Sequence, residues 1–189
     1  MEKLTNEVLE TIKSRRSVRK FLQEKIKQEE LDAIIEAGIY AATGHNSQPW
    51  HFTVIENKAF IDEMNRKTKE AMKESDIDWV RKMGEKERLH ILGDAPMVIV
   101  VSGRQENAYS PLTDCANAIQ NMIVAAESLD IGTCYIGLTD FFFADPENLA
   151  SLNLPDGHVP YYSISIGYKD PAYVWKTPTR NTDVVSYIR

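Results

Sequence analysis

Five consecutive apolar residues at positions 97–101, with the sequence MVIVV, constrain the fold more than any other part of the chain. Successive side chains of a strand point to opposite faces of the sheet, so a strand made of this run is apolar on both faces. Such a strand is stable only where both faces of the sheet are covered, which places it at the centre of a layered fold. Ala95 and Pro96, directly before the run, are expected to open the strand.

Three other segments are predicted to be extended. Residues 50–55 (WHFTVI) alternate between apolar and polar as a strand does, and residues 161–168 (YYSISIGY) supply another strand. Residues 133–138 (TCYIGL) form a short buried segment. Because helices and strands are mixed along the chain without strict alternation, the pattern favours an α+β layer over a doubly wound fold.

Four segments have the apolar periodicity of helices. They cover about residues 8–14, 28–42, 58–73 and 112–129; the third is expected to be exposed, and the fourth, the longest apolar helix, is expected to close at Gly132. The predicted core positions of the second and fourth helices are Leu31, Ile34, Ile35, Ile39, Ala116, Ile119, Met122, Ile123, Ala126 and Leu129.

Length and composition narrow the functional classes. No linker or repeat divides the chain, so one domain is expected over residues 1–189. A net charge of -6 disfavours a general nucleic-acid binder, and no apolar run is long enough to span a membrane. The polar N-terminus does not resemble a signal peptide, and Cys115 and Cys134 fit neither a CxxC pair nor a zinc site. We therefore expect a cytoplasmic protein with buried, reduced cysteines and with no nucleic-acid or membrane partner.

The first chemically informative motif is the run RRSVR at residues 15–19. Arginine binds phosphate through bidentate, charge-assisted hydrogen bonds, and Ser17 adds a donor, so the motif suits a phosphate site. The alternative is a solvated charge cluster at the C-terminal end of a helix, where cations are favoured in any case.

Two further motifs suit a planar ligand. Residues 46–50 (NSQPW) place Asn46 and Gln48 on a polar loop, where their amides can bind the edge of a heterocycle; the alternative is an Asx turn with capping roles. Residues 132–137 (GTCYIG) have a glycine at each end, which would let the backbone approach a ligand closely. The alternative for this second motif is a buried strand that follows a helix cap.

The order of these motifs resembles the FMN-dependent nitroreductase family. RRSVRKF, NSQPWHF, APMVIVV and GTCYIG follow one another with the spacing of that family, and the resemblance extends from Thr11 to about Arg180. It implies an α+β fold with a central, mostly antiparallel sheet flanked by helices. It also implies an intertwined homodimer with two flavins at the interface between the subunits.

The resemblance implies roles in FMN binding for residues of all three motifs. The arginine motif matches the segment that holds the phosphate and part of the ring, and Asn46 and Gln48 match polar positions around the flavin. Thr43 and Gly44 match a segment that reaches the flavin from the other subunit. The third motif matches backbone that lies against the central ring nitrogen, and a C-terminal cation matches a further phosphate contact. The matching residues are Arg15, Arg16, Ser17, Arg19, Thr43, Gly44, Asn46, Gln48, Tyr135, Ile136, Gly137 and Arg180.

Two positions depart from the family pattern. Thr43 stands where many relatives have serine, and Pro178 stands where some relatives have a second cation. The phosphate site is therefore expected to depend more on the N-terminal arginines.

The implied activity is electron transfer from NADH or NADPH, through FMN, to a small acceptor such as a nitroaromatic or a quinone. A ping-pong order is expected, because no acid–base pair stands out in the sequence and hydride or electron transfer needs little from side chains. Three alternatives stay open. They are another flavin reaction on the same scaffold (dehalogenation, ene reduction or substrate oxidation), a flavin-binding protein without efficient turnover, and a structural protein that binds no flavin.

Overall fold

A computed structural model describes residues 4–189. Its centre is an antiparallel sheet with the strand order β1-β2-β4-β3. The strands are β1 (Trp50–Ile55), β2 (Met97–Arg104), β3 (Ile131–Ile136) and β4 (His158–Tyr168). The predicted α+β fold with a mostly antiparallel sheet is therefore confirmed.

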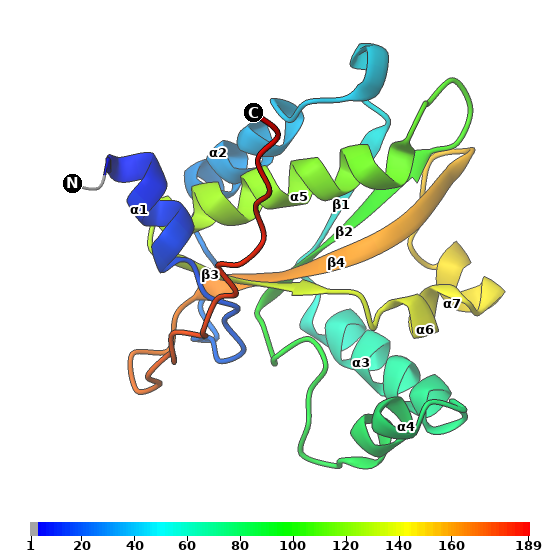
Figure 1. The fold of residues 1–189 in the computed structure, drawn as a ribbon. Coiled ribbons are helices and arrows are strands. Elements are labelled where there is room, and N and C mark those ends of the chain that lie inside the picture. Colours follow the sequence, from blue (N-terminus) through cyan, green and yellow to red (C-terminus); the bar gives the residue numbers. More distant parts are fainter. Residues whose placement is uncertain (1–3) are drawn as a thin grey trace.

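Helices cover both faces of this sheet (Figure 1). On one side lie α2 (Gln28–Ile39) and α5 (Pro111–Ser128), with α1 (Glu7–Ser14) against the end of α5. On the other side lie α3 (Lys58–Lys73), α4 (Asp78–Glu85) and the short helices α6 (Asp140–Phe143) and α7 (Pro146–Ala150). A single 3-10 turn, η1 (Gly44–Asn46), follows α2.

The strand β2 is one of the two interior strands of the sheet, as its apolar run predicts. Met97, Ile99 and Val101 pack in the cluster under α2 and α5, whereas Val98 and Val100 pack in the cluster under α3 and α6. All five are at most 1% exposed. Because both faces of this strand are buried, a polar side chain at any of the five positions would lose hydration without an evident partner.

Two boundaries of the predicted helices are wrong. The second helix ends at Ile39 rather than near residue 42, and the Ile39 side chain is 47% exposed. The helix α5 ends at Ser128, and Asp130, with a φ of 58°, supplies the left-handed residue that terminates it. Gly132, expected to close the helix, lies inside β3.

Most of the predicted helix core is confirmed, with exceptions at the edges. Leu129, just past the end of α5, is 43% exposed, and Ala116 is half-buried because it lies at the margin of the buried stripe. Ile35 is likewise half-buried. Cys115 and Cys134 are free and buried, as expected.

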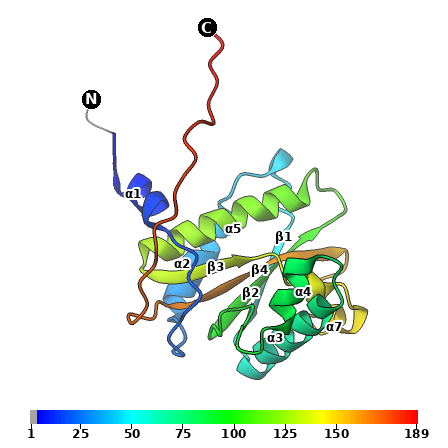
Figure 2. The same cartoon turned by 60° about the horizontal axis from the view of Figure 1, so that its bottom comes forward.

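The C-terminal tail leaves the body of the molecule. After a bridge between Phe21 and Lys169, the chain to residue 189 forms no helix or strand, and Figure 2 shows it extending away from the helices. Its apolar side chains are largely exposed: Val174, Val184, Val185, Tyr187 and Ile188.

None of the helices within residues 4–189 combines the length and the apolar character that crossing a membrane requires.

Candidate functional site

The arginine motif lies along the open edge of β3. Ser17 forms a parallel bridge with Thr133, and the N–H of Val18 donates to the Thr133 carbonyl at 2.8 Å. Val18 is fully buried, so the segment is anchored by its one apolar residue while its neighbours face outward. The backbone of Ser17 therefore extends the sheet beyond β3 at this point.

Gly132 makes this anchoring possible. A Cβ added at Gly132 would lie 2.7 Å from Cγ1 of Val18, so the close backbone approach at this glycine is to Val18. The interpretation that both glycines of GTCYIG serve an approach to a ligand is therefore wrong for Gly132. At Gly137 an added Cβ would have its nearest neighbour, in the Tyr162 ring, at 3.8 Å, which leaves that position open.

We expect Gly132→Ala to lower the free energy of unfolding by about 1–3 kcal/mol, because the methyl group overpacks the contact with Val18. Gly137→Ala is the matched control, since its added methyl meets only ordinary contacts. Thermal or urea denaturation of the two variants measures the difference. Equal stability of the two variants would contradict the close contact at Gly132.

Arg16 behaves as the alternative interpretation of the motif predicts. Its guanidinium donates to the carbonyls of Lys13 and Ser14, each at 2.7 Å, at the C-terminal end of α1. It also donates to Oγ1 of Thr177 in the tail at 2.9 Å. The side chain thus caps α1 and ties the tail to it, so these hydrogen-bond donors are already in use.

Arg15 and Arg19 have free guanidinium charge. Neither forms an ion pair with a carboxylate of residues 4–189; Arg19 donates only to the Ser17 carbonyl, at 3.4 Å. Both charges lie near the Cys134 thiol: burial raises the pKa of Cys134, and the positive charges of Arg19 and Arg15 partly oppose that rise. The two cations therefore act on one region beside β3.

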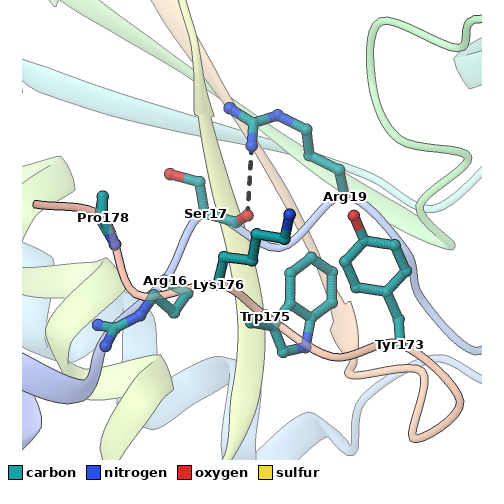
Figure 3. Close-up of a pocket in the computed structure, with 7 residues that line it drawn as sticks. All are labelled: Arg16, Ser17, Arg19, Tyr173, Trp175, Lys176 and Pro178. Carbon is teal, nitrogen blue, oxygen red and sulfur yellow. Dashed lines mark hydrogen bonds between the residues drawn. The ribbon is translucent and has the colours of Figure 1, made fainter.

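The C-terminal tail closes a pocket over this region (Figure 3). The pocket has a volume of about 330 Å³, and its wall includes three cationic side chains, Arg16, Arg19 and Lys176, together with the ring of Trp175. Lys176 was not among the predicted residues; its position shortly before the predicted Arg180 was the available signal. Arg180 itself is exposed in the tail and does not line the pocket. The full lining is Arg16, Ser17, Arg19, Tyr173, Trp175, Lys176 and Pro178.

The second half of the β3 edge is open. Backbone groups of an antiparallel strand alternate in direction, and the Thr133 carbonyl points outward to Val18. The N–H and C=O of Tyr135 therefore point to the same outer edge of β3 as the Thr133 carbonyl. The N-terminal segment does not cover this part of the edge, because after Ser17 it turns toward Lys169. The Tyr135 ring packs against Tyr162 with centroids 4.8 Å apart, and burial raises the pKa of the Tyr135 hydroxyl. Ile136 is buried beneath this edge.

The polar loop after α2 is strained and anchored. His45, Asn46 and Gln48 have φ values of 52°, 55° and 42°, in the left-handed region that residues other than glycine rarely adopt. The carboxylate of Asp114, in the first turn of α5, accepts from the Gly44 N–H at 3.3 Å and from Oγ of Ser47 at 3.2 Å. Sequence reasoning missed Asp114, although an acid inside an otherwise apolar helix is a visible signal.

The structure separates the predicted residues into two groups. Arg15, Ser17 and Arg19 lie together with Tyr135, Ile136 and Gly137 beside β3. Thr43, Gly44, Asn46 and Gln48 lie at the opposite end of α5, where Asp114 holds their loop, while Ser14 bonds Glu127 near the other end of that helix (Figure 1). A helix of 18 residues spans roughly 27 Å at 1.5 Å per residue. Within one chain, the loop therefore does not join the arginines.

Comparison with known proteins gives consistent matches. A model of the nitroreductase family matches residues 12–168. A putative NADH dehydrogenase/NAD(P)H nitroreductase of Methanothermobacter thermautotrophicus is 29% identical over 165 residues, which cover 86% of this chain and 77% of that protein.

Solved structures agree in fold. A nitroreductase with bound FMN from Bacteroides fragilis is 37% identical, with a TM-score of 0.89 over 98% of this chain and 100% of the other. A nitroreductase with bound FMN from Desulfitobacterium hafniense is 27% identical, with the same TM-score and the same coverage of both chains.

Proposed function

Since the chain belongs to the nitroreductase family and is an NAD(P)H-dependent flavin oxidoreductase with FMN as its cofactor, we propose that it reduces small acceptors such as nitroaromatics and quinones. The observation that supports the FMN site on which this proposal depends is the pair of guanidinium charges of Arg15 and Arg19. They are held without a carboxylate partner among residues 4–189, beside a strand edge whose backbone is open.

The residues beside β3 fit the chemistry of FMN. A phosphate needs cations and hydroxyl donors, which Arg15, Arg19 and Ser17 supply, with Lys176 on the tail. A flavin ring presents hydrogen-bond acceptors along one edge, and the outward N–H of Tyr135 is a donor without a strand partner. Arg180 in the exposed tail is proposed to add a further cation.

The chain's own contribution to the reaction is position and charge. The side chains that line the pocket of Figure 3 are mostly cationic or apolar, and they supply charge and shape around a bound phosphate. When bound, FMN would supply the redox chemistry, namely hydride transfer from NAD(P)H and electron transfer to the acceptor, for which a ping-pong order is proposed. Arg15 and Arg19 retain the phosphate, and the Tyr135 backbone orients the ring edge.

A homodimer is proposed on the basis of the exposed apolar surface and the divided site. Val8 and Ile12 on α1 are 62% and 50% exposed, and they line a groove of about 410 Å³ with Ala37, Val124 and Ala125. A second copy of the chain would cover this groove and the apolar tail. The second copy would also bring its loop 43–48 to the arginine site of the first copy. Within one chain, this loop lies at the opposite end of α5 from the arginines.

The simplest test of the function uses the purified protein. We expect a visible flavin spectrum, rapid bleaching by NADH or NADPH under anaerobic conditions, and recovery of the oxidised spectrum when a nitroarene or a quinone is added. A colourless protein that takes up no added FMN would contradict FMN binding. If the protein binds FMN but neither NADH nor NADPH reduces it, the alternative of a flavin-binding protein without efficient turnover would be favoured.

A panel of acceptors separates the alternative flavin reactions. A halogenated aromatic tests dehalogenation, and an activated alkene tests ene reduction, each against the nitroarene and the quinone at equal concentration. The proposal expects the nitroarene or the quinone to have the highest kcat/KM. A clear preference for the halogenated compound or the alkene would contradict the proposal and favour dehalogenation or ene reduction, respectively.

A further inference from the structure

A line of polar side chains on α5 follows the C-terminal end of α2 and the loop after it. Nδ2 of Asn121 donates to the Ala37 carbonyl at 3.1 Å, and Nδ2 of Asn117 donates to the Ala42 carbonyl at 3.3 Å. Residues three and four apart share one face of a helix, so these asparagines and Asp114 form a single stripe. From Asn121 through Asn117 to Asp114, successive members of the stripe contact residues that come progressively later in the segment formed by α2 and its loop.

Asp114 is the most buried member of this stripe, with 3% of its surface exposed. Its two carboxylate oxygens accept from Gly44 and Ser47, on either side of the left-handed residues His45 and Asn46. Its position in the first turn of α5 favours a negative charge, because the positive end of the helix dipole lies there. An apolar residue of similar size at this position would accept neither of the two hydrogen bonds from the loop.

The loop needs such a restraint. Left-handed backbone at His45, Asn46 and Gln48 is unfavourable, so it persists only where surrounding contacts hold it. These three residues are exposed in their own chain. Arg104 adds a second restraint, since its guanidinium donates to the Ser47 carbonyl at 3.1 Å.

We propose that Asp114 is a positioning residue that holds the loop 43–48 in the conformation in which it completes the FMN site of a second copy of the chain. This inference rests on the proposed function and on the proposed homodimer. Asp114 itself touches no cofactor; it acts through the loop backbone. Its removal should therefore change how tightly and in what environment FMN is held.

The test compares three variants by FMN affinity. Asp114→Ala removes both contacts, and we expect the Kd for FMN, measured by fluorescence titration of the apoprotein, to rise at least about tenfold. Asp114→Asn keeps an acceptor for Gly44 and a group that can bond Ser47, so its Kd should stay within about threefold of wild type. Thr113→Ala, an exposed neighbour in the same turn whose Oγ1 accepts from Oγ of Ser110 rather than from the loop, is the control and should bind FMN as wild type does.

A second readout excludes a purely structural role. At saturating FMN, the visible circular dichroism of bound flavin should change in Asp114→Ala and be restored in Asp114→Asn. An alanine variant that melts at a lower temperature but keeps the wild-type Kd and flavin dichroism would overturn the inference. If that variant does not fold, Ser47→Ala decides, with a several-fold weaker Kd expected and an unchanged Kd contradicting the proposal. Wild-type protein that binds no FMN would instead refute the proposed function.

Discussion

Replacing Arg19 by alanine is expected to weaken FMN binding by about tenfold to a hundredfold. The guanidinium is free of any carboxylate of residues 4–189, so its charge is available to a phosphate, and a charge-assisted hydrogen bond contributes roughly 1.5–3 kcal/mol. Fluorescence titration of the apoprotein with FMN measures the loss. Lys20→Ala is the matched control, because Lys20 is an adjacent exposed cation that does not line the pocket of Figure 3.

Riboflavin makes this experiment specific. It has the ring of FMN but no phosphate, so Arg19→Ala should leave riboflavin binding almost unchanged while FMN binding falls. Equal losses for the two ligands would place Arg19 at the ring rather than at the phosphate. Unchanged FMN binding would show that Arg19 is a solvated charge near the end of α1.

The number of intact FMN sites in a mixed dimer is expected to depend on whether two substitutions lie on the same chain or on different chains. One defect is Arg19→Ala; the other is the double substitution Asn46→Gly with Gln48→Gly, where glycine tolerates the left-handed backbone. If the loop serves the partner's site, a dimer with the two defects on different chains keeps one intact site. A dimer with both defects on one chain keeps none.

The opposite outcome has an equally clear meaning. If each loop served the arginines of its own chain, the intact site would survive only when both defects are on one chain. Differently tagged subunits, purified as heterodimers, allow bound FMN to be counted per dimer by absorbance. A chain that stays monomeric in sedimentation would contradict the proposed homodimer directly.

The architecture was largely predictable because it depends on local pattern. The apolar run at 97–101 was expected in the interior of the sheet, because an apolar strand is stable only where both of its faces are covered. The structure buries all five residues. The predicted helix ends were less accurate, because Asp130 terminates α5 through its backbone conformation and not through a residue type that sequence patterns favour. Leu129 was assigned to the core on periodicity alone, but it lies beyond the last turn and faces outward.

The candidate site was predictable only in its residue types. Arg15, Arg16 and Arg19 are equivalent in the sequence, yet Arg16 donates to the carbonyls that end α1, whereas the other two have no carboxylate partner among residues 4–189. The role of Gly132 depends on Val18, which is far away along the chain, and the role of Asp114 depends on a loop that precedes it by about seventy residues. Such contacts leave no local periodicity, so a single sequence does not reveal them.

The sequence by itself determined an apolar core, an interior strand and the set of cationic and amide side chains from which a phosphate and ring site can be built. Apolar periodicity and side-chain chemistry are properties of neighbouring residues, which explains why these features could be read directly. Only the tertiary structure decided which arginines are free, which glycine serves packing, and that the loop lies at the far end of α5 from them. Those outcomes depend on distances between remote segments, which are set when the helices pack against the sheet.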